Sequence, residues 1–228
     1  MKKFILSLLA ISTSFLIHAQ NEHNLVPNPS FEEVDGKIKS AGQVTLASPW
    51  KAVNMQPVDL YSADAKNDEF GVPENKYGEE KAKTGNNYAG VAFYGYRGRM
   101  PRTYLGTQLT NPLIAGKEYC LKFHVSMSDR SKYASNNISM SISKEEIVEM
   151  SEQNLSLEPH AQSYTNKVFD QQFLWEPICR TYTAKGGEQY IVIGNFKTDE
   201  ETTTEAVRLS REFSGRQEYN AYYYIDDV

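Results

Sequence analysis

Three arginines and three tyrosines gather within eleven residues of a chain that is acidic overall. They are Tyr94, Tyr96, Arg97, Arg99, Arg102 and Tyr104. Tyrosine rings can stack on the apolar faces of sugars, and arginine offers fixed hydrogen-bond donors to hydroxyl groups and carboxylates. We therefore take this segment as the candidate ligand-binding site, with acidic glycans or the peptidoglycan stem as fitting ligands. The alternative is that the tyrosines pack in the core and the arginines pair with the surplus acids.

The two cysteines and four histidines show no catalytic pattern. His124 shares a predicted strand face with Cys120, but residues four apart on a strand are too distant for a direct hydrogen bond, since each residue rises about 3.3 Å. We expect a disulfide between Cys120 and Cys179, because an even cysteine count favours pairing in an oxidising compartment. Two buried free thiols are the alternative.

The sequence contains no G-x-S-x-G elbow, no H-E-x-x-H motif and no phosphate-binding loop. Several acids are adjacent in sequence, among them Glu145-Glu146, Glu200-Glu201 and Asp226-Asp227. Adjacency is not the paired geometry that glycoside hydrolysis needs. We therefore expect a chain without catalytic residues, and a secreted hydrolase is the least favoured interpretation.

The first twenty residues have the pattern of a secretory signal peptide. Lys2 and Lys3 are followed by an apolar stretch from Phe4 to Ile17, which is too short to span a bilayer. Cleavage near Gln20 leaves 208 residues (228 minus 20) as one predicted domain, 21–228, with a net charge of −7 instead of −5. An acidic exported chain without a basic tract argues against nucleic acid and against polybasic membrane binding.

The segment from Trp175 to Phe196 predicts two β-strands joined by a tight turn at 185–188. The paired glycines can take the positive φ that a short hairpin needs. Because a hairpin alone is marginal in water, we expect it in the middle of a larger sheet. Residues 119–128 give the clearest alternation of apolar and polar positions, which predicts a further strand.

Other segments complete an all-β chain with one short helix. Residues 24–33 predict an edge strand or its approach, and residues 54–87 predict a long surface excursion of functional or mobile character. Ser143 and Glu146 form a capping-box pattern that predicts a helix from Lys144 to about Gln153, with Ile147 and Met150 facing inward. Strands with long loops and no βαβ alternation indicate an antiparallel β-sandwich.

Several segments resemble known domains. The ends of the chain, Asn24–Glu33 (NLVPNPSFEE) and Tyr224–Val228 (YIDDV), resemble the terminal strands of galactose-binding-like jelly rolls, which include many carbohydrate-binding modules. A closer resemblance is to the N-terminal sandwich domain of certain OmpA-family outer-membrane proteins, carried in order by Ser128–Asn137, Trp175 and Ala184–Phe196. That family continues into a peptidoglycan-binding domain, so the chain is expected to be a fragment or a shorter relative.

The resemblance also implies a structural Ca²⁺ where the first and last strands meet. Glu32 and Asp226 are the matching residues, and Ca²⁺ takes several hard oxygen ligands of this kind. The alternative is that both acids cap turns and face water.

These observations together predict a non-catalytic binding module of the cell envelope, exported to the periplasm or outer membrane. Its expected partner is a glycan, peptidoglycan or an envelope protein. The main alternative is a structural adaptor that docks a secretion or motility complex and binds no sugar.

Overall fold

The computed structural model describes residues 24–209, 213 and 216–228, which form two packed antiparallel β-sheets. Sheet A has the strand order β1-β6-β12-β9-β10, and sheet B has the order β11-β7-β14-β5-β2. The strands of sheet A are β1 (Lys51–Ala52), β6 (Leu105–Gln108), β9 (Ser139–Ser143), β10 (Ala161–Gln162) and β12 (Tyr190–Gly194). Those of sheet B are β2 (Asp59–Ser62), β5 (Asn87–Gly95), β7 (Glu118–Met127), β11 (Glu176–Thr183) and β14 (Asn220–Asp226).

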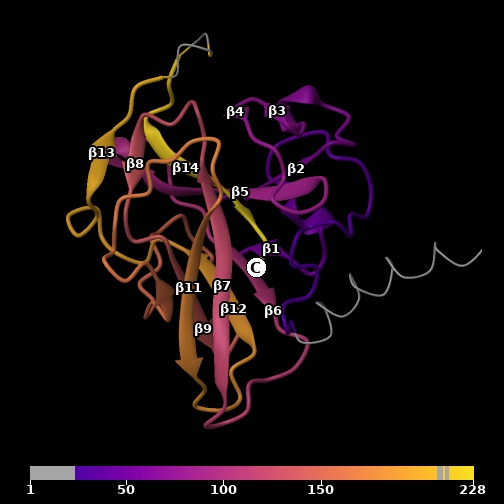
Figure 1. Cartoon of the computed structure of the whole chain (residues 1–228), viewed down its shortest axis with the longest axis vertical. Helices are drawn as coiled ribbons and strands as arrows, with labels where there is room; N and C mark the ends of the chain where they lie inside the picture. The colour runs from indigo at the N-terminus through magenta and orange to yellow at the C-terminus, as the bar shows by residue number, and fades with distance from the viewer. Residues whose placement is uncertain (1–23, 210–212, 214–215) are drawn as a thin grey trace, which may run out of the picture.

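Two small ribbons and three short 3-10 turns lie outside these sheets. The ribbons pair β8 (Tyr133–Ser135) with β13 (Thr204–Ala206) and β3 (Glu74–Asn75) with β4 (Gly78–Glu79). The turns are η1 (Val44–Leu46), η2 (Asp68–Phe70) and η3 (Tyr96–Gly98). Figure 1 shows the two ribbons on opposite sides of the molecule.

From β5 onward the main strands alternate between the sheets. β5, β7, β11 and β14 belong to sheet B, while β6, β9, β10 and β12 belong to sheet A. Of these, only β9 and β10 are successive strands in the same sheet, which is the order of a jelly roll. The predicted antiparallel sandwich is confirmed, and its inner core holds alternate residues such as Phe123 and Val125 of β7 and Phe93 of β5.

The predicted hairpin at Trp175–Phe196 is wrong, because its two strands belong to different sheets. β11 is the edge of sheet B, and β12 lies inside sheet A. The Gly186-Gly187 turn has the expected positive φ at both glycines, but it pairs with the loop before β7. Gly187 N donates to Leu113 O at 2.8 Å, and Leu113 N donates to Glu188 O at 2.7 Å. The turn therefore carries the chain across the sandwich.

The predicted helix from Lys144 to about Gln153 is also wrong. Ser143 ends β9, and its hydroxyl donates to Glu145 O at 2.8 Å instead of capping a helix. Glu149 N then donates to Val53 O at 2.9 Å, so the segment follows the edge of sheet A as irregular backbone. Ile147 packs against a small core cluster, whereas Met150 is 77% exposed and does not face inward.

Residues 24–33, predicted as an edge strand or its approach, form no strand and run as irregular backbone beside the end of β14. Val228 N donates to Pro29 O at 3.0 Å, and Asn24 Nδ2 donates to Val228 O at 2.9 Å. Phe31 is buried against Trp50 with a ring-centroid distance of 5.0 Å. Irregular backbone thus joins the two ends, because Phe31 sits at a φ of 59°, which no strand allows.

The predicted signal peptide, residues 1–20, lies outside the described residues. Within 24–209, 213 and 216–228, no helix has the length and apolar character needed to cross a membrane.

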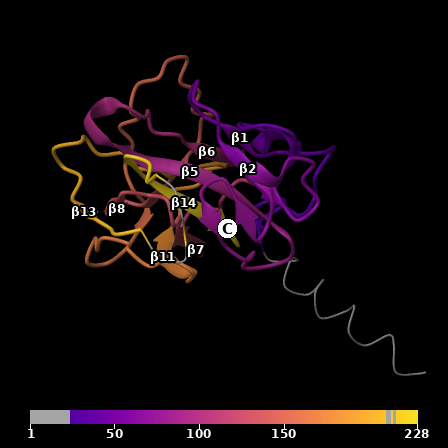
Figure 2. The same ribbon diagram turned by 90° about the horizontal axis from the view of Figure 1, so that it is seen from above.

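The outer face of sheet B carries a layer of buried tyrosines. They are Tyr61 of β2, Tyr88 of β5, and Tyr222 and Tyr224 of β14. The predicted surface excursion at 54–87 is wrong in part, because residues 59–62 form β2, the buried edge strand of sheet B, which contributes Tyr61. The segment that follows β2 covers the layer: Tyr77, between β3 and β4, stacks on Tyr222 with centroids 4.0 Å apart. Figure 2 shows β2 and the N-terminal residues on this side of the molecule, away from β8 and β13.

Asp59 and Asn75 satisfy the hydroxyl groups of this layer. Asp59 accepts a hydrogen bond of 2.8 Å from Tyr222, whose hydroxyl lies 2.9 Å from that of Tyr61. Asn75 of β3 donates to Tyr88 at 3.0 Å and accepts from Tyr224 at 2.8 Å. Asn75 therefore holds the segment after β2 to sheet B through hydrogen bonds with the buried hydroxyl groups of Tyr88 and Tyr224.

A side chain at Gly90 should disrupt this layer, because a Cβ there would lie 2.0 Å from the Tyr222 hydroxyl and 2.7 Å from the Tyr61 ring. We expect Gly90→Ala to lower the free energy of unfolding by about 1–3 kcal/mol in urea denaturation. Combining it with Tyr222→Phe, which removes the first atom struck, should cost less than the two single losses added together. Unchanged stability of Gly90→Ala would contradict this packing.

Cys120 and Cys179 lie on the paired strands β7 and β11. Cys120 is opposite Thr181, and Cys179 is opposite Lys122, so the cysteines are diagonal neighbours. Both are exposed rather than buried, and their sulfur atoms are 3.3 Å apart without a bond. The disulfide stays a prediction, and the strand pairing places its two partners within reach.

Protein exported to an oxidising compartment should carry this bridge. Intact-mass measurement after thiol alkylation should find neither cysteine labelled. For a loop of 59 residues, the chain-entropy model gives about 4 kcal/mol, so a reductant should lower the melting temperature. The double variant Cys120→Ser/Cys179→Ser is the control, since reductant should leave it unchanged. Two alkylated thiols in protein never exposed to reductant would refute the bridge.

Candidate functional site

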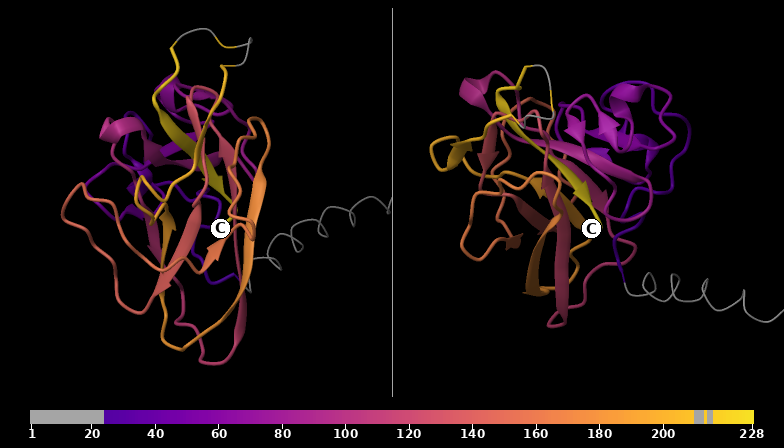
Figure 3. Two further views of the ribbon diagram at one scale, coloured as in Figure 1. Left: turned by 90° about the vertical axis from the view of Figure 1, so that its left-hand side faces the viewer. Right: turned by 45° about the horizontal axis from the view of Figure 1, so that its top comes forward.

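Four tyrosines from three distant segments meet beside the end of β5. Tyr94 is the next-to-last residue of β5 and Tyr96 begins η3, while Tyr133 comes from β8 and Tyr219 directly precedes β14. Figure 3 shows β8 next to β14 at this end of the sandwich. We call these four residues and Arg97 the tyrosine cluster. Only Tyr94, Tyr96 and Arg97 belonged to the candidate site predicted from the sequence.

The rings of the tyrosine cluster contact one another in a row. Tyr96 stacks on Tyr133 with centroids 5.3 Å apart and an interplanar angle of 14°. Tyr94 meets Tyr133 edge-on at 6.0 Å, and Tyr219 is tilted against Tyr96 at 6.1 Å. The Arg97 guanidinium lies 5.0 Å from the Tyr96 ring centre. Tyr219 is exposed and the other three rings are half-buried, so the row is open to solvent.

A tight turn after β5 positions Tyr96 and Arg97. Tyr96 N donates to Tyr219 O at 2.9 Å, which ties the turn to the strand that leads into β14. Gly95 must lack a side chain, since a Cβ would lie 1.8 Å from Met100 O. Arg97 has a φ of 52°, an uncommon conformation for a residue other than glycine. Strained backbone of this kind is concentrated at functional sites.

Arg102 and Tyr104, which the sequence analysis placed in the candidate site, are buried in the interior and are not part of the tyrosine cluster. Arg102 is 2% exposed, and its guanidinium donates to Asn195 O at 3.2 Å and to Asp199 Oδ1 at 2.5 Å. The Tyr104 hydroxyl donates to Asn195 O at 3.0 Å and accepts from Leu155 N at 2.9 Å. Both side chains hold irregular backbone around the end of β12. Arg99 is exposed, and its place in a binding site stays a prediction.

The tyrosine cluster can bind a ligand through ring faces and hydrogen bonds. Burial raises the pKa of Tyr94, and burial also raises that of Tyr133, so both hydroxyl groups stay protonated at neutral pH and can donate. Arg97 is exposed and adds a permanent positive charge at the rim. Aromatic faces, hydroxyl donors and a guanidinium together suit a sugar that carries a carboxylate.

Tyr133 and Tyr219 were missed by the sequence-based prediction. Tyr133 lies 37 residues beyond Tyr96 in sequence, and Tyr219 lies 123 residues beyond it. No local pattern brings them together, because their proximity comes from the contact of β8 with β14 and from the pairing of β14 with β5.

Glu32 and Asp226, the predicted calcium ligands, both bind the backbone of the loop before β5. Glu32 Oε1 accepts from Asn86 N at 2.9 Å and from Asn87 N at 2.8 Å. Asp226 Oδ2 accepts from the backbone of Lys83 and Thr84 at 2.8 and 3.0 Å, and burial raises its pKa to about 8. Three N–H groups, counting that of Asp227, thus point at the Asp226 carboxylate.

This donor set fits a turn-capping role better than a cation site, since N–H groups present positive charge to the carboxylate oxygens. In the described part of the chain, no three His, Cys, Asp or Glu side chains come together as a possible metal site. Calcium binding stays a prediction.

His124 and His160 each lie against other parts of the fold. His124 is buried, and its Nδ1 atom lies 3.9 Å from Asp227 Oδ2, while the sulfur of Cys120 faces Cys179. His160 Nδ1 accepts from Ile142 N at 3.2 Å, which joins the loop before β10 to β9. Among the described residues, no hydrogen bond joins either imidazole to a serine, threonine or cysteine side chain.

No protein-family model matches the chain, and no curated protein matches it. Among solved structures, the K2 cleaved adhesin domain of Lys-gingipain has 13% sequence identity and a TM-score of 0.41, over 87% of this chain and 94% of that one. The K1 cleaved adhesin domain of Lys-gingipain from Porphyromonas gingivalis W83 has 15% identity and a TM-score of 0.37, over 87% and 92%. Similarity this low establishes no family, and no site residue is transferred from either domain.

The capping role of Asp226 predicts how Asp226→Asn behaves. An amide nitrogen would replace one acceptor oxygen and face a backbone N–H, which should lower the free energy of unfolding by about 1–3 kcal/mol. Thermal melts should show losses of similar size in calcium and in a chelator. A loss seen only in calcium would instead establish a metal ion at Glu32 and Asp226.

Proposed function

We propose that this chain is a non-catalytic glycan-binding module of the cell envelope. The observation that carries the proposal is the tyrosine cluster, where three half-buried rings, one exposed ring and Arg97 form an open row at one end of the sandwich. Tyr94 and Tyr133 lie on strands, and a backbone hydrogen bond from Tyr96 N to Tyr219 O joins the other two segments, which reduces the conformational entropy lost when a ligand binds.

Acidic glycans and peptidoglycan are the ligand classes that fit the row. A pyranose ring presents an apolar C–H face to a tyrosine, and its hydroxyl groups can accept from the tyrosine hydroxyls. Arg97 provides a charge-assisted hydrogen bond to a sugar or peptide carboxylate. The net charge of −5 disfavours polyanions in general, so Arg97 has to act locally rather than through the field of the whole molecule.

Export to the periplasm or the outer membrane belongs to the same proposal. It is supported by the signal-peptide pattern of residues 1–20 and by the adjacent cysteines on β7 and β11. The resemblance of the sequence to OmpA-family sandwich domains adds a reason to test peptidoglycan first. A glycan, peptidoglycan or an envelope protein remains the partner class.

A structural adaptor is the second candidate function. Met55, Val148 and Met150 are exposed, and backbone hydrogen bonds from Glu149 N to Val53 O and from Met55 N to Ser151 O bring their segments together. An exposed apolar group of this kind is typical of a protein–protein contact. The adaptor becomes the leading interpretation if no glycan binds.

The test is retention on insoluble peptidoglycan together with a glycan array, each with and without calcium. We expect saturable binding by the wild-type mature chain. The variant Tyr96→Ala/Tyr133→Ala removes the stacked pair and should weaken binding by about tenfold or more. Arg97→Ala should weaken binding selectively for glycans that carry a carboxylate.

Tyr164→Ala is the matched control, since Tyr164 is an exposed tyrosine that lies against Arg180 of β11 and makes no ring contact with the tyrosine cluster in the described part of the chain. Its binding should equal that of the wild type. Melting temperatures of all variants should show that they are folded. Full retention by the folded Tyr96→Ala/Tyr133→Ala variant would remove the tyrosine cluster as the site.

A further inference from the structure

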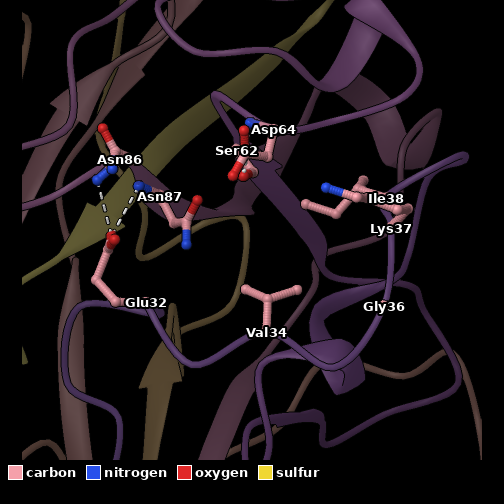
Figure 4. A pocket seen from close by; sticks show the side chains of 9 residues that line it. All are labelled: Glu32, Val34, Gly36, Lys37, Ile38, Ser62, Asp64, Asn86 and Asn87. Carbon is pink, nitrogen blue, oxygen red and sulfur yellow. Dashed lines mark hydrogen bonds between the residues drawn. The ribbon is translucent and has the colours of Figure 1, made fainter.

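A polar cavity lies at the opposite end of β5 from the tyrosine cluster. It has a volume of about 280 Å³ and is lined by Glu32, Val34, Gly36, Lys37, Ile38, Ser62, Asp64, Asn86 and Asn87. Figure 4 shows these side chains around one hollow, with Asn87 reaching into it. Asn87 begins β5 and Tyr94 nearly ends it, so about 23 Å of strand separates the two places.

The cavity contains a buried acceptor that has no partner. Asn87 is 5% exposed, and its Nδ2 atom donates to Phe31 O at 2.9 Å. Its Oδ1 atom is buried and receives no hydrogen bond within the described residues. Buried polar atoms are almost always paired, so an orphaned one in a cavity indicates a missing donor.

Further acceptors face the same space. Glu32 uses Oε1 for the N–H groups of Asn86 and Asn87, and no hydrogen bond within the described residues reaches Oε2. Asp64 is exposed, and its carboxylate makes no hydrogen bond or ion pair with the residues that the structure describes. Ser62 accepts from Asp64 N at 3.1 Å, which leaves its own hydroxyl proton available.

The remaining lining residues add one cation and little accessible apolar surface. Val34 is half-buried and Ile38 is buried, so neither presents a wide aliphatic face to the cavity. Lys37 is exposed at the edge. The hydroxyl groups of a pyranose unit match these side chains, because they can donate to carboxylates and to an amide oxygen and can accept from lysine.

We infer that this cavity binds a single neutral sugar unit through hydroxyl groups that donate to Asn87 Oδ1, Glu32 and Asp64. The choice of a sugar rests on the proposed glycan-binding function, but the residues are separate from the tyrosine cluster. The cavity volume allows one ring, so the site recognises an individual sugar unit and not an extended chain.

The experiment is an amide NMR titration of the folded mature chain with glucose, galactose and N-acetylglucosamine in turn. At least one sugar should cause saturable shifts of the Asn87 side-chain amide and of the Asn86 and Asn87 backbone amides. The variant Glu32→Gln/Asp64→Asn keeps the side-chain shapes and the oxygen at position 32 that accepts from Asn86 N and Asn87 N. It removes both negative charges and replaces one acceptor oxygen in each side chain, so it should weaken sugar binding by about tenfold or more. Glu33→Gln, which changes the neighbouring exposed acid, should bind like the wild type.

The outcomes separate this inference from the proposed function. Pocket shifts that persist in Tyr96→Ala/Tyr133→Ala establish a distinct site. Sugar shifts confined to the tyrosine cluster would refute the cavity site and leave the proposed function intact. Shifts at Asn87 that appear with calcium chloride but with no sugar would also refute the cavity site. If no sugar causes shifts anywhere and no glycan retains the protein, both the cavity site and the proposed function are refuted.

Discussion

The tyrosine hydroxyl groups on the outer face of sheet B are the constraint that the rest of the structure depends on. Burying them without partners would destabilise the fold, so the side chains of Asp59 and Asn75 must face this layer to accept and donate. Asp59 belongs to β2, and Asn75 belongs to the segment that follows it, which is why a polar segment of little periodicity folds tightly. The outer face of sheet B is thereby covered at β2, β5 and β14, whereas Cys120 and Cys179 stay exposed on β7 and β11. β5 is fixed along its whole length, with a candidate site at each end.

Regular alternation along single strands predicted the sandwich, because apolar residues at every second position need an apolar partner sheet. β7 and β9 follow that pattern, whereas β5 and β14 are buried along nearly their whole length. Pairing partners were harder to predict. The Gly186-Gly187 turn reverses the chain as a hairpin turn would, but its backbone hydrogen bonds go to Leu113, and the two flanking strands belong to different sheets. The capping-box pattern at Ser143 did not produce a helix, because a distant strand partner again decided the local structure. Gln189 N donates to Ser143 O, so Ser143 continues β9 and does not begin a helix.

The candidate site could be predicted only in part. Tyr94, Tyr96 and Arg97 remain together because they are adjacent in sequence at a strand end. Arg102 and Tyr104 are a few residues further on, yet their side chains turn inward to hold the backbone at Asn195. Composition cannot separate a surface tyrosine from a buried one with a satisfied hydroxyl. The cavity at Asn87 was likewise invisible, since its lining comes from three segments that meet only in the folded chain.

Hydroxyl-radical footprinting with and without a retained glycan tests glycan binding at the tyrosine cluster most directly. Each tyrosine reports its own solvent access, so the ligand position is read without altering the protein. Bound glycan should reduce oxidation of Tyr96, Tyr133 and Tyr219 and leave the highly exposed Tyr164 unchanged. Equal oxidation of the tyrosine cluster with and without a retained glycan would contradict the proposed site.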